Sequence, residues 1–235
     1  MSDSTQYLNQ LLFVLLPYVA LFTFFLITIQ RYLQRSFTYS SLSSQFLENK
    51  QHFWGLVPFH YGILVVLAGH FVGFLLPREV LWWNSIPARL YVLETSALIF
   101  GLLTVVGLVS ALVRRFEVRK VRRVTNLSDW ILYVMLLLQT GSGVAVALFH
   151  PWGSSWFAAS ASPYLWSIIT LNPNVTYIAT MPWLVKLHIL NAYLVVGLFP
   201  FTRLVHILVV PNPYLWRKPQ VVRWNWDPRT IRKGS

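Results

Sequence analysis

Residues 53–76 read FWGLVPFHYGILVVLAGHFVGFLL, an apolar run that holds His60 and His70 but no Asp, Glu, Lys or Arg. A helix that crosses a bilayer needs about 20 mainly apolar residues, so the run predicts a membrane span over 54–76. Ionisable side chains inside a membrane are costly and usually mark a proton relay or a ligand site. The two histidines therefore predict partners elsewhere in the chain.

A second pair of histidines, His188 and His206, lies in the last apolar run. On one continuous helix these two would share a face about 27 Å apart, whereas His60 and His70 would be about 15 Å apart. The two separations disagree. A single histidine is as readily a hydrogen-bonded core residue as a ligand, but four of them on two spans favour two metal centres.

The composition is that of an integral membrane protein, because 56% of the 235 residues are hydrophobic and 16% are aromatic. The formal net charge is +12. The Lys and Arg residues cluster between the apolar runs, which indicates membrane topology and argues against a nucleic acid partner. The chain has no Cys, which excludes disulfides, thiolate-bound zinc, iron–sulfur clusters and the covalent attachment of c-type haem.

The apolar runs predict an all-α integral membrane fold, a bundle of five transmembrane helices over residues 1–213, with a basic cytoplasmic tail over 214–235. A charge-free, Trp-rich segment over 150–183 predicts a cover on the outer face. The predicted spans are 11–29, 54–76, 90–113, 127–149 and 184–210.

The densest cationic block lies between spans three and four, and the bias of Lys and Arg toward the cytoplasm puts this loop inside. Asp129 follows, where it can cap the fourth span or pair with the block. The N-terminus is then outside and the C-terminus in the cytoplasm. The block comprises Arg114, Arg115, Arg119, Lys120, Arg122 and Arg123.

Spans two and five run antiparallel in this topology. His60 is then level with His206 near the cytoplasm, and His70 with His188 near the outer face. Two imidazoles on opposite sides of one iron ligate haem b, whereas zinc or copper usually needs further ligands and no carboxylate lies at these depths. The bundle is therefore expected to hold two haem b groups.

Two arginines are candidate partners for the anionic propionates of the inner haem. Arg203 lies about one turn from His206, and Arg115 lies in the cationic loop. The alternative for Arg203 is a side chain that snorkels to the inner headgroups. The glycines of span two, at positions 55, 62, 69 and 73, allow close approach of either a neighbouring helix or a flat macrocycle.

The histidine segments FHYGILVVLAGHF (59–71) and LHILNAYLVVGLFPFTRLVHI (187–207) are similar to those of a known family, as are SSQFLENK (43–50) and RRFEVRKVRRVTNLSD (114–129). Together they resemble the gamma subunit of membrane-bound respiratory nitrate reductase, a five-helix dihaem cytochrome b. The resemblance covers most of the chain and puts the four axial ligands at His60, His70, His188 and His206.

The resemblance also implies a quinol pocket near the outer haem. In the family a lysine at the start of span three contacts the quinone oxygen, and the corresponding residue here is Arg89. That departure keeps the charge but changes the geometry of the donor. Gly69 and His70 match the other side of the pocket. As an alternative, Arg89 anchors the helix start to the headgroups.

The function implied by the resemblance is that of a quinol-oxidising subunit of a respiratory nitrate reductase in the cytoplasmic membrane. Quinol is oxidised near the outer face, and electrons pass through the two haems to an iron–sulfur (beta) subunit and a molybdenum (alpha) subunit. The docking surface expected for these partners is the inner loop 39–50, the cationic block and the tail. Membrane lipids are the other expected partner of the tail.

Two alternatives stay open. The same histidines would serve a dihaem, quinone-linked subunit of a sulfite-reductase- or heterodisulfide-reductase-type complex. The second alternative is a different class of protein, a haem-free transporter or assembly factor in which the histidines conduct protons. His52 and His150 belong to neither pair and are expected to have no catalytic role.

Overall fold

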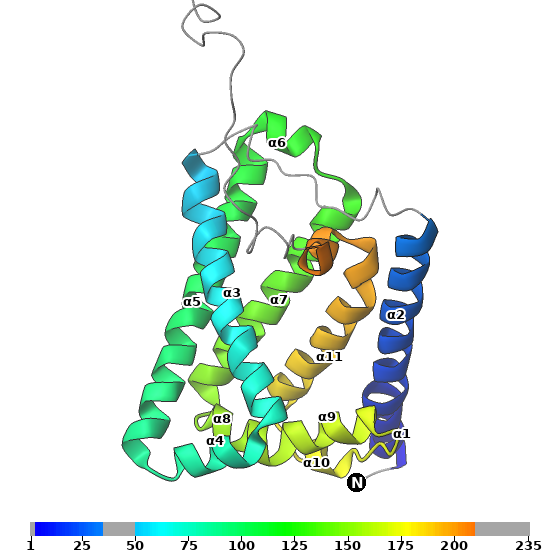
Figure 1. The fold of residues 1–235 in the computed structure, drawn as a ribbon, viewed down its shortest axis with the longest axis vertical. Coiled ribbons are helices and arrows are strands. Elements are labelled where there is room, and N and C mark those ends of the chain that lie inside the picture. The colour runs from blue at the N-terminus through cyan, green and yellow to red at the C-terminus, as the bar shows by residue number, and fades with distance from the viewer. Residues whose placement is uncertain (1–2, 35–49, 210–235) are drawn as a thin grey trace, which may run out of the picture.

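The computed structural model describes residues 3–34 and 50–209 (Figure 1). Within these residues the chain is helical and contains no strand. Five helices there are long and apolar enough to cross a membrane: Gln6–Gln34, Gly55–Leu75, Pro87–Glu117, Leu127–Phe149 and Trp183–Phe201. The predicted all-α bundle of five membrane helices is thus confirmed. The polar loop up to residue 49 and the basic tail over 214–235 lie outside the described residues.

The first span is a helical rod interrupted by one π-helical turn, made of α1 (Asp3–Gln10), η1 (Leu11–Leu15) and α2 (Leu16–Gln34). Pro17 has no N–H to donate to the carbonyl of Phe13 four residues earlier. The hydroxyl of Tyr164 donates to that carbonyl instead, at 2.8 Å. Burial raises the pKa of Tyr164 well above its ordinary value, so this hydroxyl stays a neutral donor.

The second and third spans, α3 (Lys50–Leu75) and α5 (Pro87–Glu117), pack closely through glycines. A Cβ added at Gly55 would lie 3.1 Å from the backbone nitrogen of Ala111, and one at Gly62 would lie 2.7 Å from the carbonyl oxygen of Phe100. The stripe at these positions therefore serves helix packing. Gly69 differs, because nothing lies within 4 Å of its added Cβ.

One end of the bundle, here called the α4 end, is closed by a layer of short helices (Figure 1). Ala158, Ala161, Ile168 and Ile178 in this layer are each at most 3% exposed. The cover predicted over 150–183 thus contributes to the core as well as to the surface. The helices of the whole layer are α4 (Pro77–Asn84), α8 (Gly153–Trp156), η3 (Phe157–Ala161), α9 (Ser162–Ile169) and α10 (Thr176–Ala179), of which all but α4 belong to the segment 150–183.

The opposite end, here called the α6 end, carries α6 (Arg119–Arg123) and the start of α7 (Leu127–Phe149). Asn126 caps α7: its side chain accepts from the backbone N–H of Asp129 at 3.0 Å, while its own N–H donates to the Asp129 carboxylate at 3.1 Å. The reciprocal bonds fix the start of α7, as the sequence suggested for Asp129.

The fifth span is not one continuous helix. The sequence predicts a span over 184–210, but α11 (Trp183–Leu198) is followed by the 3₁₀ turns η4 (Phe199–Phe201) and η5 (Arg203–Val209). Pro200 cannot donate a backbone hydrogen bond and so ends the helix. The guanidinium of Arg31 in α2 donates to the Pro200 carbonyl at 2.5 Å and so stabilises the backbone where the helix ends. His188 and His206 therefore do not share a face of one helix, which removes the disagreement between the two histidine spacings.

Candidate cofactor site

The four histidines form two facing pairs between α3 and the fifth span. The ring centroids of His60 and His206 are 6.2 Å apart, and those of His70 and His188 are 6.3 Å apart. With a metal–nitrogen bond of about 2 Å, two imidazoles on opposite sides of one metal ion have centroids about 6 Å apart. These are the two pairings that the antiparallel direction of spans two and five predicts. In each pair the rings are as far apart as two imidazoles that bind one metal ion from opposite sides.

In three of the rings a hydrogen bond fixes which nitrogen is free. The Nδ1 atom faces a nearby backbone carbonyl, to which Nδ1–H donates, so the lone pair of Nε2 is left for a metal. The bonds join His60 to Leu56 at 2.7 Å, His70 to Val66 at 2.8 Å and His206 to Arg203 at 2.7 Å.

The fourth ring, His188, is oriented by side chains of α7. The hydroxyl of Ser142 donates to the carbonyl of Gln139 and lies 3.0 Å from His188 Nδ1, so it accepts the Nδ1 proton. The Gln139 amide nitrogen lies 3.2 Å from Nε2. Asn191, 1% exposed, donates to Gln139 Oε1 at 2.7 Å and fixes that amide. A Cβ added at Gly143 would lie 3.0 Å from His188 Cε1, so a larger residue at this position would clash with the imidazole ring.

Sequence reasoning missed Gln139, Ser142 and Asn191. A signal was present, because all three are polar residues inside apolar spans, where polar side chains usually have a partner. Their partners could not be assigned without knowing which face of α7 meets α11.

The α3 face between the histidines suits a flat, apolar group. Leu64 and Leu67 lie four and seven residues after His60, so they share its face, and they are 62% and 52% exposed. Among the described residues there is no cluster of three or more His, Cys, Asp or Glu that could hold a metal ion. Two protein ligands per level fit an iron whose other four positions a porphyrin occupies, so the residues present fit haem b.

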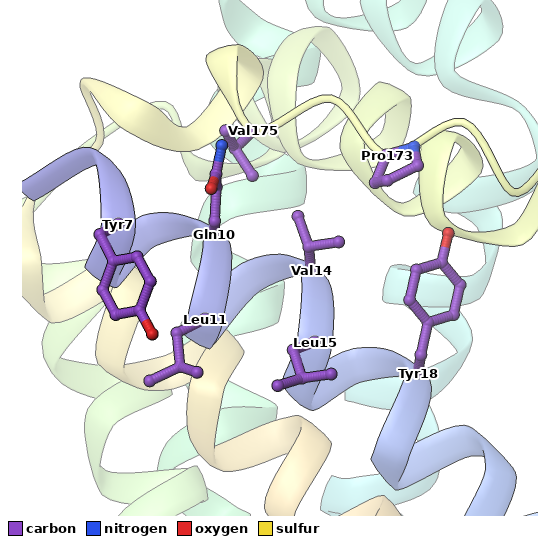
Figure 2. Close-up of a pocket in the computed structure, with 8 residues that line it drawn as sticks. All are labelled: Tyr7, Gln10, Leu11, Val14, Leu15, Tyr18, Pro173 and Val175. Carbon is purple, nitrogen blue, oxygen red and sulfur yellow. The ribbon is translucent and has the colours of Figure 1, made fainter. Parts of the chain in front are cut away.

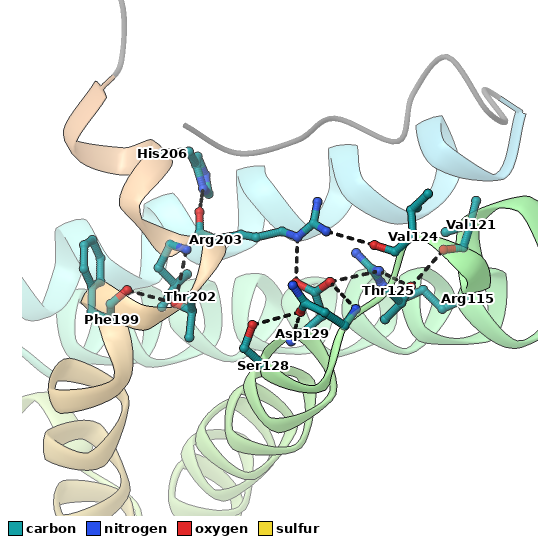
Figure 3. A network of polar contacts seen from close by, with 12 residues as sticks. Arg115, Val121, Val124, Thr125, Ser128, Asp129, Phe199, Thr202, Arg203 and His206 are labelled. Atoms are coloured by element: carbon teal, nitrogen blue, oxygen red, sulfur yellow. Dashed lines mark hydrogen bonds and ion pairs between the residues drawn. The ribbon is translucent and has the colours of Figure 1, made fainter. Parts of the chain in front are cut away.

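At the α6 end the two arginines singled out from the sequence lie around Asp129, which is 2% exposed (Figure 3). Arg203 Nε donates to Asp129 Oδ1 at 2.6 Å, and Arg203 Nη2 donates to the Val124 carbonyl at 3.1 Å. Arg115 Nη1 donates to Thr125 Oγ1 at 2.7 Å and lies 4.0 Å from Asp129 Oδ2. A buried carboxylate thus gathers positive charge beside the His60–His206 pair.

At the α4 end Arg89 lies at the start of α5, with its guanidinium 5.2 and 5.1 Å from the ring centroids of Trp82 and Trp83. The interactions described for Arg89 run to α4 and to Ile86, and those of His70 run to Val66, Phe157 and His188. The structure therefore gives Arg89 and His70 no direct contact. Gly69 leaves open space beside His70.

A groove lies elsewhere on the molecule, between the first span and residues 173–175 (Figure 2). None of the four paired histidines lines it. Its lining residues are Tyr7, Gln10, Leu11, Val14, Leu15, Tyr18, Pro173 and Val175.

The sequence model of the nitrate reductase gamma subunit family matches residues 9–225. The chain belongs to this family. It is 31% identical to the nitrate reductase gamma chain of Bacillus subtilis, over 92% of this chain and 98% of that one. It is also 31% identical to the respiratory nitrate reductase 2 gamma chain of Escherichia coli, over 93% and 98%. The resemblance found in the sequence is confirmed, and this gamma subunit is an integral membrane protein.

Proposed function

We propose that this gamma subunit is a dihaem cytochrome b that oxidises quinol near the outer face of the cytoplasmic membrane and delivers electrons to a nitrate reductase. The observation that carries the proposal is the two facing histidine pairs, each with the spacing expected of two imidazoles that bind one metal ion from opposite sides. Bound haem would supply a one-electron carrier at each level.

The chain's own residues have distinct parts in this function. His60 and His206 would hold the inner haem, and His70 and His188 would hold the outer one. Arg203 and Arg115 lie beside the His60–His206 pair at the α6 end, and their positive charge would neutralise the anionic propionates of the inner haem.

The quinol pocket is proposed at the α4 end, which we assign to the outer face. Gly69 leaves space for a ring next to His70, and Arg89 supplies a charged donor at the start of α5. Trp82 and Trp83 hold that guanidinium through cation–π contacts. With haem bound, this end would accept the two electrons of the quinol one at a time, and the two protons of the quinol would leave to the outer face.

The α6 end is proposed to face the cytoplasm, with the N-terminus outside. Arg119, Lys120, Arg122 and Arg123 are exposed there, and clustered cations favour the cytoplasmic side. We propose that this surface docks the iron–sulfur (beta) subunit, which passes electrons to the molybdenum (alpha) subunit. The tail over 214–235 is proposed to join this surface or bind anionic headgroups.

The test is a reduced-minus-oxidised optical spectrum of the purified protein, with haem quantified per chain, for wild type and for His70→Ala and His206→Ala. We expect two low-spin b haems in wild type and one in each variant. A folded wild-type protein without haem would overturn the proposal and favour proton conduction by the histidines. Identification of the subunits that co-purify distinguishes a nitrate reductase from a sulfite- or heterodisulfide-reductase complex.

A further inference from the structure

The break at Pro200 leaves His206 in an unusual position for an axial ligand. His60 and His70 lie on α3 and His188 lies on α11, whereas His206 lies on η5, a short 3₁₀ segment beyond the break. A short 3₁₀ segment is held weakly by its own hydrogen bonds. The position of this segment, and with it the direction of the His206 ring, must therefore be fixed by contacts with other elements.

We propose that Asp129 is the residue that positions the inner histidine pair, acting through Arg203 on His206. The inference rests on the proposed function, because it assumes that His60 and His206 hold the inner haem. Asp129 itself reaches neither ring and is a positioning residue, not a ligand.

Arg203 connects the buried carboxylate to the imidazole in two bonds (Figure 3). Its side chain donates to Asp129 at 2.6 Å and to the Val124 carbonyl at 3.1 Å, which fixes η5 against the start of α7. Its backbone carbonyl accepts from His206 Nδ1 at 2.7 Å. Arg203 therefore does two things: its side chain attaches η5 to the start of α7, and its carbonyl orients the His206 ring so that Nε2 faces His60.

The hydrogen bond between Asp129 and Arg203 requires a charged side chain at both positions. Asp129 is 2% exposed, and the backbone N–H of Asn126, which any residue at that position supplies, donates to its carboxylate at 3.1 Å. A hydrogen bond between two ions is roughly twice as strong as a neutral one. Asp129→Asn removes the charge that holds the Arg203 side chain. Arg203→Gln leaves the buried Asp129 carboxylate with Arg115 at 4.0 Å, which is too long for a hydrogen bond, so either change weakens the anchor of η5 on α7. The segment that carries His206 would then rotate away from His60.

The outer pair does not depend on this anchor. His70 is bonded to Val66 within α3, and His188 is bonded to Ser142 within the body of α7. Loss of the Asp129–Arg203 pair should therefore remove one haem and spare the other. A general structural defect would not show this selectivity.

The experiment measures haem per chain and the optical spectrum in Asp129→Asn and Arg203→Gln, each purified in detergent beside wild type. Both variants should fall from two haems to one, with the spectrum of His206→Ala. Combining either variant with His206→Ala should cause no further loss of haem. As a control, Asn126→Ala removes the side-chain cap of α7 but leaves the Asp129–Arg203 pair, so it should keep both haems.

Two results would overturn the inference. One is a full complement of two haems with unchanged spectra in both Asp129→Asn and Arg203→Gln. The other is loss of both haems in both variants, which would show that the pair supports the whole bundle. Failure of the proposed function looks different, because wild type would then lack haem as well, and the inference would fall with it.

Discussion

Gly143→Ala is the substitution that tests the outer pair most sharply. The added Cβ would lie 3.0 Å from Cε1 and 3.6 Å from Nδ1 of His188. Carbon atoms in contact prefer separations of about 3.5–4.0 Å, so the ring must retreat from α7 by roughly 0.5 Å. Retreat by that much stretches the Ser142 hydrogen bond from 3.0 Å to about 3.5 Å, near the limit for such a bond. It also exceeds the tolerance of about 0.2 Å expected of a metal–ligand distance.

We therefore expect Gly143→Ala to lose most of the outer haem and keep the inner one, giving about one haem per chain. Quinol oxidation should fall with the outer haem. The assay is haem quantification with a low-temperature difference spectrum that separates the two centres. Gly141→Ala is the matched control, because it lies on the same helix and nothing is within 4 Å of its added Cβ. It should retain both haems.

The reasoning is refuted if Gly143→Ala and Gly141→Ala have the same haem content and spectrum. It is also refuted if Gly143→Ala loses the inner haem, because His206 lies on a different element and has no contact with the added group.

Three further predictions concern single side chains. Ser142→Ala removes the acceptor for His188 Nδ1–H, and a redox titration should show a shifted midpoint for the outer haem and an unchanged one for the inner haem. Tyr164→Phe removes the hydroxyl that donates to the Phe13 carbonyl, which should cost about 1–3 kcal/mol and lower the unfolding temperature in detergent; an unchanged temperature would mean that another group satisfies the carbonyl. Arg89→Ala should cut quinol oxidation at least tenfold with both haems retained, while Arg89→Lys should keep most of the activity; equal rates in Arg89→Ala and wild type would remove Arg89 from the quinol pocket.

Much of the fold could be predicted from the sequence, because apolar runs long enough to cross a membrane have few alternatives to helices. The predicted fourth span, 127–149, has the same limits as α7. The level pairing of the histidines needed only the alternating direction of successive spans. Neither inference required knowledge of side-chain packing.

The break in the fifth span could not be predicted with the same ease. Pro200 is visible in the sequence, but membrane helices often continue through proline when neighbours satisfy the freed backbone groups. Here the donor to the Pro200 carbonyl is Arg31, from the other end of the chain. Such a contact exists only after the bundle has assembled. The glycines of α3 were ambiguous for a similar reason, since helix packing and cofactor packing demand the same small residues.

The acceptors behind the four rings differ in a way that matters for variation and engineering. Three imidazoles donate to main-chain carbonyls, and a carbonyl is present whichever amino acid occupies the position. The fourth donates to a serine hydroxyl, which one base change can remove or replace. The Nδ1 acceptors of the His60–His206 pair therefore do not depend on any side chain, whereas the His70–His188 pair has one replaceable acceptor, Ser142. On the proposed function, that serine is the position at which a single substitution would change the potential of the outer haem.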